Sequence, residues 1–228
     1  MRSLITILLI LGLSSNVLAH SETAPTYNRI NLNEQAASDV DNDLLVAVLF
    51  VQKEGRRADL LAREINKSID EAVTQAKKVP GVKVQTLSYR TNATYKKNAV
   101  NGWRVHQSIR LESQNSEVLG ELIGKLQNKL SVQSIGYQIS DDKRREHTDE
   151  LIGLALKRFQ QRASNIAKAM GHSGFKLVRL TINNGRSQQP PVAFSMAASR
   201  SREAAPVRIE AGTQRVEITV NGEIELGK

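Results

Sequence analysis

Residues that commonly catalyse reactions or bind metals are few and scattered in this chain of 228 residues, which has four histidines and no cysteine. The histidines are His20, His106, His147 and His172, and none stands at a metal-ligand spacing from another. The glycines stand singly rather than in a phosphate-binding loop, and no Gly-x-Ser-x-Gly motif provides a nucleophile. The sequence therefore predicts a protein that is not an enzyme, with no catalytic residue, no metal site and no cofactor.

An acidic cluster, Asp39, Asp41 and Asp43, has the alternating carboxylates with which a calcium-binding loop begins. The glycine and the terminal glutamate that such a loop requires are missing after it. We therefore expect these residues to form a turn that leads into a strand rather than a cation site.

Two further groups admit either a binding or a structural interpretation. Trp103 and His106 could contact a ligand together, but a half-buried strand normally uses its only tryptophan for packing. The mixed-charge run over residues 141–150 could be a docking face, but charges in the first turns of a helix usually face solvent. The structural interpretation is favoured for both.

The amino-terminal residues have the three parts of a bacterial secretory signal. Arg2 supplies a positive charge, residues 4–13 form an apolar core too short to span a bilayer comfortably, and small residues up to Ala19 provide a cleavage site. This pattern predicts a signal peptide over 1–19, cleaved after its last residue, and a polar tether over 20–26. A retained membrane anchor is the alternative. No later segment is apolar for long enough to cross a membrane, so we expect an exported, soluble protein of the periplasm.

The chain is basic, with 32 Lys and Arg against 23 Asp and Glu and a formal charge of +9. Cleavage of the signal would remove Arg2 alone, which leaves 31 cations and 23 acids, or +8. Such an excess suits nucleic acid, anionic lipid or simple solubility. Export argues against nucleic acid, and the cations are spread along the chain, so solubility is favoured and an anionic envelope surface is the alternative. Without cysteine, stability must come from burial.

Hydrophobic periodicity predicts the elements that position these residues. A weakly patterned strand is expected over 27–40 and a central strand over 43–54, where apolar residues run almost without interruption. Residues 57–78 have apolar residues at helical spacing, two lysines in the last turn and a Pro-Gly stop. A strand over 82–90, a polar loop over 91–102 with a turn at Asn101-Gly102, and a strand over 103–113 should follow.

The second half of the chain predicts two more helices. The helix over 116–130 begins with Ser116 as its N-cap, and a strand over 132–140 follows. Asp141 or Asp142 should cap a long helix that ends at Gly171. Its apolar line comprises Ile152, Ala155, Phe159, Ala163, Ile166 and Met170, and its cations Lys157, Arg158, Arg162 and Lys168 fall mostly on the solvent side. A strand over 175–183, a mobile loop over 184–206 and a closing strand within 215–226 complete the chain.

The expected order of elements is ββαββαβαββ, which lacks the simple βαβ alternation of a parallel sheet. It favours the α+β class: two interlocked two-layer α/β sandwich units with largely antiparallel sheets and helices packed on one face. The two units should together occupy residues 27–226, sharing strands across the sequence.

Three stretches are distinctive in their order and spacing. The long helix carries Ala155, Arg162-Ala163, Ile166-Ala167 and Gly171; a strand with Thr86-Leu87-Ser88-Tyr89 leads through a polar loop to Gly102-Trp103; and Ala211-Gly212 precedes the alternating strand 216–226. In these stretches the chain resembles the SIMPL-domain family of exported bacterial proteins, which includes the periplasmic immunogenic proteins. Phe159 stands where a small residue is common in that family.

The resemblance implies an α+β fold, a periplasmic or outer-membrane-associated location and no established catalytic site. Some relatives assemble into large ring- or channel-like homo-oligomers, and others are linked to protection against oxidative stress. Our leading hypothesis is therefore a non-enzymatic envelope protein that self-associates or binds another envelope component.

The alternative hypothesis is a binding module for an anionic envelope ligand such as lipopolysaccharide, phospholipid or a peptidoglycan fragment. Its contacts would be the arginines that bracket the predicted mobile loop, Arg186, Arg200, Arg202 and Arg208. A secreted hydrolase is a third class, and it would require acid–base residues that converge in a cleft.

Overall fold

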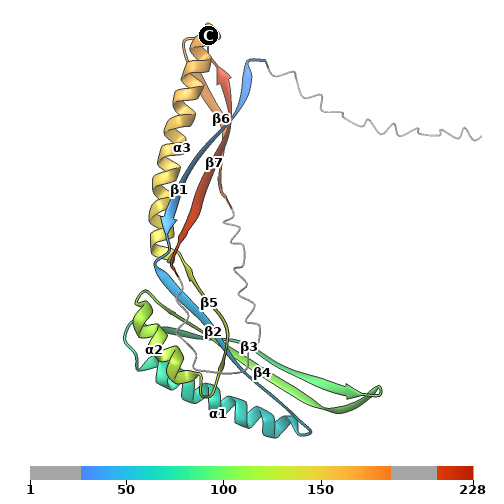
Figure 1. Ribbon diagram of the computed structural model, residues 1–228. Coiled ribbons are helices and arrows are strands. Elements are labelled where there is room, and N and C mark those ends of the chain that lie inside the picture. Colours follow the sequence, from blue (N-terminus) through green and yellow to red (C-terminus); the bar gives the residue numbers. More distant parts are fainter. Residues whose placement is uncertain (1–26, 186–209, 228) are drawn as a thin grey trace, which may run out of the picture.

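The computed structural model describes residues 27–185 and 210–227, which form seven strands and three helices in the predicted order. The elements are β1 (Arg29–Asp41), β2 (Leu44–Gly55), α1 (Ala58–Lys77), β3 (Lys83–Lys96), β4 (Ala99–Ser113), α2 (Ser116–Leu126), β5 (Ser131–Gln138), α3 (Asp141–Ala169), β6 (Phe175–Asn184) and β7 (Thr213–Leu226). They form two antiparallel sheets, each with helices on one face, which confirms the α+β class (Figure 1).

The first of the two units, which we call the α3 unit, takes its strands from both ends of the sequence. Its sheet has the order β1-β7-β6, and β1 pairs with β7 from Arg29 opposite Glu225 to Asp41 opposite Thr213. α3 packs mainly on β1 and β7 and contacts β6 least. The unit is therefore closed only when the last strand pairs with the first.

The second unit, which we call the α1–α2 unit, is continuous in sequence and lies end to end with the first (Figure 1). Its sheet has the order β3-β4-β2-β5, so β2 is a central strand, as predicted. Leu45, Ala47 and Leu49 on β2 are buried with Ile65 of α1 and Leu122 of α2 in one core cluster. The β2 residues between them are only partly buried, so its apolar run contributes to both faces of the sheet.

The predicted loop over 91–102 is wrong, because these residues continue β3 and begin β4 in one long hairpin. The turn consists of Lys97 and Asn98, which both have positive φ angles of 49° and 61° and so match a two-residue turn. Gly102 lies within β4, where a Cβ atom would be 2.9 Å from the carbonyl oxygen of Gly55. A glycine is therefore required at position 102 by the close approach of two backbones and not by a turn.

Each of the two predicted N-caps lies one or two residues after the N-cap in the structure. Asn115, not Ser116, caps α2, and its side chain accepts a hydrogen bond from the Val118 amide at 3.1 Å. Ser140, not an aspartate, caps α3, and its hydroxyl accepts from the Lys143 amide at 3.4 Å. Each true cap neighbours a residue with an equally good capping side chain, so composition alone does not separate them.

The buried line of α3 differs in part from the predicted one. The buried residues are Leu151, Ala155, Phe159, Ala163 and Ala167, a constant spacing of four. Met170 is 62% exposed, and Ile152 and Ile166 are only partly buried at the margin of the core. Four residues turn a helix by about 40° more than a full circle, so the buried stripe winds around α3 as it crosses the twisted sheet.

Phe159 is 2% exposed and fills space left by a glycine on the facing strand. A Cβ atom on Gly222 of β7 would lie 2.5 Å from Cζ of Phe159 and 2.7 Å from its Cε2. No side chain other than hydrogen fits there without displacing the ring.

Of the acidic cluster only Asp43 lies at the junction between the two units, whereas Asp39 and Asp41 belong to β1 and not to the predicted turn. β1 ends at Asp41 and β2 begins two residues after Asn42. The Asp43 carboxylate accepts hydrogen bonds from the amide and hydroxyl of Ser140, both at 2.7 Å, and from the Gln114 amide group at 3.0 Å. Burial opposes ionisation of Asp43, but these hydrogen bonds outweigh it and hold its pKa below the ordinary value.

Candidate interaction surfaces

The described residues contain no cluster of side chains typical of a metal centre. No three histidine, aspartate or glutamate side chains among them are grouped so that they could hold a metal ion. His106 stacks on Phe50 with ring centroids 5.3 Å apart, and His172 Nδ1 lies 2.5 Å from the carbonyl oxygen of Gly227. Trp103 packs against the core from the other face of β4, so it does not form a binding pair with His106.

The four arginines predicted to contact an anionic ligand, Arg186, Arg200, Arg202 and Arg208, lie outside the described residues. So does almost all of the predicted mobile loop, and so do the predicted signal peptide and tether. Within the described part of the chain, no helix is both long and apolar enough to cross a membrane.

Three exposed aliphatic residues on β6, Leu177, Val178 and Ile182, form the first candidate surface, which we call the β6 edge. β6 is the last strand of its sheet, and no described strand pairs with its outer side. Because α3 lies over the other two strands, β6 also has little cover from the helix. No described strand pairs with the amide and carbonyl groups on the outer side of β6, so within the described part of the chain these groups and the aliphatic side chains can both be reached by a partner.

The opposite edge of the same sheet is protected by the cations of α3. Arg158 Nη1 donates a hydrogen bond to the Gln35 carbonyl oxygen of β1 at 2.8 Å, and Arg162 Nη1 lies 2.8 Å from Glu34 Oε1. A charged side chain on a backbone carbonyl hinders the addition of another strand. Two of the four helix cations therefore contact β1 instead of only facing solvent.

The end of the β3–β4 hairpin forms the second candidate surface. The last residue of β2, Gly55, pairs with Trp103, so residues 94–102 continue as a two-stranded ribbon without a third strand. We call residues 94–102 the hairpin tip; Figure 1 shows it extending past α1. Tyr95 is 68% exposed and pairs directly with Val100, which is 55% exposed. The tip therefore presents an aromatic and an aliphatic side chain together on one face.

The cations around this end outnumber the acids. Residues 52–64 and 92–104 hold seven Lys and Arg and three acids, a net charge of +4. Each of these acids forms an ion pair: Glu54 with Arg104 at 2.5 Å, Glu64 with Lys53 at 2.5 Å, and Asp59 with two arginines. The tip residues Lys96 and Lys97 form no ion pair with any described acid.

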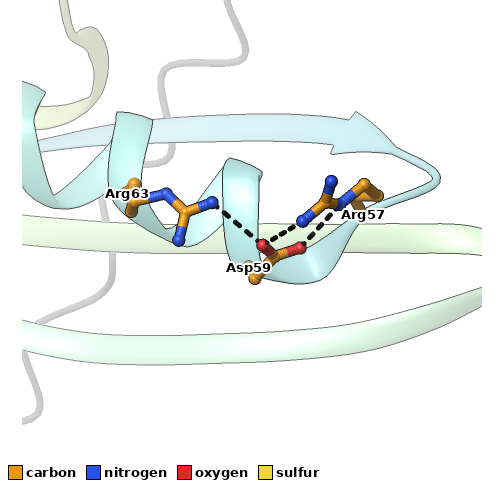
Figure 2. A network of polar contacts seen from close by, with 3 residues as sticks. All are labelled: Arg57, Asp59 and Arg63. Carbon is orange, nitrogen blue, oxygen red and sulfur yellow. Dashed lines mark hydrogen bonds and ion pairs between the residues drawn. The ribbon is translucent and has the colours of Figure 1, made fainter.

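The Asp59 network shows how strongly the acids here are neutralised (Figure 2). Arg57 donates to the Asp59 carboxylate through Nε at 3.1 Å and Nη2 at 2.7 Å, and Arg63 Nη2 donates at 2.9 Å. The hydrogen bonds from Arg57 lower the pKa of Asp59 to about 2, and Asp59 in turn raises the pKa of Arg57. Asp59 therefore stays ionised and shared between two guanidinium groups.

Comparison with known protein families gives one match. The SIMPL family model, described as a protein of unknown function (DUF541), matches residues 30–224. The chain belongs to the SIMPL family. This confirms the resemblance drawn from the spaced alanines, the central strands and the closing strand. No curated protein matches the chain.

Solved structures similar to this SIMPL chain resemble it only in part. One is a hydantoinase/carbamoylase-family amidase from Burkholderia vietnamiensis, with 11% identity, 44% of this chain and 29% of that chain covered, and a TM-score of 0.29. Another is a putative amidohydrolase/peptidase from Burkholderia cenocepacia, with the same identity and coverages and a TM-score of 0.27. This chain thus spans less than a third of each of these two structures.

Neither surface was found from the sequence of this SIMPL protein. The hairpin tip falls in the stretch predicted as a loop, although Ala93 and Tyr95 before the turn alternate with polar residues as in a strand. That alternation is the signal that would have located Tyr95 on a strand face. The β6 edge depends on which strand lies outermost, and a single sequence gives no such order.

Proposed function

We propose that this SIMPL protein is a non-enzymatic component of the bacterial cell envelope, exported to the periplasm, and that it self-associates through the β6 edge. The observation that carries the proposal is the contrast between the two edges of one sheet. β1 is protected by Arg158, whereas β6 is open and carries exposed aliphatic residues. The amino-terminal signal pattern supports export.

Two copies of β6 are compatible with an antiparallel pairing across a two-fold axis, in which the same surface of each copy meets the other. In a pairing centred on Leu180, Val178 of each copy faces Ile182 of the other, so that exposed aliphatic residues are covered. Arg179 then faces Thr181, so no two cations stand directly opposite one another. The result is a continuous six-stranded sheet with one α3 for each half.

Light scattering during size-exclusion chromatography tests the proposal on the chain that begins at His20. We expect an oligomer for the wild type and a smaller species for Val178→Lys and for Ile182→Glu, because each places a charge opposite an aliphatic residue. The double variant should reassemble, since its lysine and glutamate face each other twice. Val100→Lys, on the hairpin tip, is the matched control and should not change the mass.

A wild type that stays monomeric at high concentration contradicts self-association. An oligomer whose mass both single variants leave unchanged contradicts the β6 edge as its contact. Export is tested separately, by cell fractionation and by the amino-terminal residue of the purified protein, which should be His20.

A further inference from the structure

We propose that the hairpin tip, residues 94–102, binds an anionic lipid surface. This goes beyond self-association, because it uses a different unit of the molecule and a different kind of partner. It also differs from the predicted arginine site, because none of those arginines lies in this hairpin.

The position of the tip suits contact with an extended surface. It is a two-stranded ribbon beyond the end of β2, and it projects past the helices that cover the sheet (Figure 1). A flat partner can therefore reach its side chains without meeting the body of the unit. About half of its backbone groups pair across the hairpin, and the half that point outward can bond to water and head groups in the polar region of a bilayer, so the tip suits the interface rather than the hydrocarbon core.

The side chains on the tip match the interface between lipid head groups and acyl chains. Tyr95 and Val100 stand opposite each other on one face and are both more than half exposed. A tyrosine places an apolar ring toward the acyl chains and its hydroxyl among the head groups, the arrangement for which tyrosine is enriched at membrane interfaces. Nothing in the described part of the protein covers this pair.

The positive charge of the hairpin tip indicates that the membrane surface it binds is anionic. The tip contains Lys96 and Lys97 and no acid, and the acids behind it are already paired with arginine or lysine. Lysines near a membrane surface are attracted by anionic head groups. The same charge disfavours the other obvious partner, a second hairpin tip, because four lysines would then meet without an acid between them.

Co-sedimentation with vesicles tests the inference on the chain from His20 onward, which retains every described residue. We expect binding to phosphatidylglycerol/phosphatidylcholine vesicles that weakens with added salt, and little binding to phosphatidylcholine alone. Replacing both tip lysines, Lys96→Ser/Lys97→Ser, should weaken binding on the order of tenfold or more. Tyr95→Ser should weaken it too, although it leaves the charge unchanged.

The matched control is Lys77→Ser/Lys78→Ser, which removes the same charge from two exposed lysines at the carboxyl end of α1. It should keep most of the affinity. Equal losses in the tip and control variants would mean that net charge alone drives binding, and would overturn the inference. Equal binding to neutral and anionic vesicles, or full binding by the tip variants, would overturn it as well.

Two more measurements separate this inference from the proposed function. The first uses the double variant Tyr95→Trp/Trp103→Phe, whose only tryptophan is at the tip. Its fluorescence emission should shift to the blue when anionic vesicles are added, because the indole ring enters the membrane interface. The mass of the tip variants by light scattering should equal that of the wild type. If the tip variants lost assembly, the tip would be a contact between copies and the lipid proposal would be overturned. A wild type that is monomeric but binds vesicles would contradict only self-association through the β6 edge.

Discussion

The fit between Phe159 and Gly222 gives the sharpest prediction for this fold. Gly222→Ala would place a methyl group 2.5 Å from the Phe159 ring and 3.1 Å from the Arg179 carbonyl oxygen, so the ring or the strand must move. Overpacking of this kind costs about 2 kcal/mol of the free energy of unfolding. Phe159→Ala, which removes a fully buried ring, should cost about 3 kcal/mol or more.

The effects of these two substitutions on the free energy of unfolding should not be additive. Without the ring, the new methyl group has room and fills part of the cavity, so Gly222→Ala should cost close to nothing in the Phe159→Ala background. The coupling energy is then about 2 kcal/mol, opposite in sign to the cost of the single change. Urea unfolding followed by circular dichroism measures all four free energies.

A matched control comes from Gly136 of β5, where a Cβ atom would have no neighbour within 4 Å. Gly136→Ala should leave stability nearly unchanged or raise it slightly. Additive costs at Gly222 and Phe159, or a Gly222→Ala protein as stable as the wild type, would refute the packing described for α3 and β7.

Three further changes test other parts of the structure. Asp43→Asn should destabilise the protein by about 2 kcal/mol in urea unfolding, because the carboxylate that holds Ser140 loses its charge. The pKa of Asp43 is lower in the folded than in the unfolded state, so its ionised carboxylate stabilises the fold above pH 3.8. This stabilisation is lost as the pH falls through the lower pKa of the folded state. The difference in free energy of unfolding between the wild type and the variant should vanish there. Arg57→Ser should raise the pKa of Asp59 from about 2 toward 3.8, measured by NMR titration of the carboxyl carbon, and an unchanged value would contradict the network in Figure 2. Gly102→Ala should lower the melting temperature, because a Cβ atom would lie 2.9 Å from a backbone oxygen that cannot rotate away; no change would contradict the close approach.

The fold class and the order of elements could be predicted because they depend on periodicity within short windows. The alternation along β7 and the four-residue recurrence of alanine along α3 are both visible in the sequence. The turn at Lys97-Asn98 has no strong sequence signal because neither residue is glycine, whereas the Asn-Gly pair nearby reflects the close backbone approach at Gly102. A straight apolar stripe along α3 would include Met170, but the buried stripe winds around the helix and leaves it exposed.

What could not be predicted depends on contacts between residues far apart in the sequence. The small residue that admits Phe159 is Gly222 on another strand, and no local pattern connects them. The hydrogen bond from Arg158 to the Gln35 carbonyl likewise requires knowing that β1 is an edge strand. Both candidate surfaces follow from such relations, since exposure of the β6 edge and of the hairpin tip depends on what the rest of the fold leaves uncovered.

The α1–α2 unit lies within the sequence of the α3 unit, between β1 and α3, and this has a consequence for the order in which the chain folds. The α1–α2 unit uses only residues 44–138, so its sheet and helices can form before the α3 unit does. The sheet of the α3 unit cannot form until β7 pairs with β1, and all the other helices and strands lie between these two in the sequence. Contacts of such long sequence separation form slowly. Until β7 pairs, the apolar faces of β1 and α3 lack their permanent cover, so the partly folded chain is most prone to aggregate at this stage.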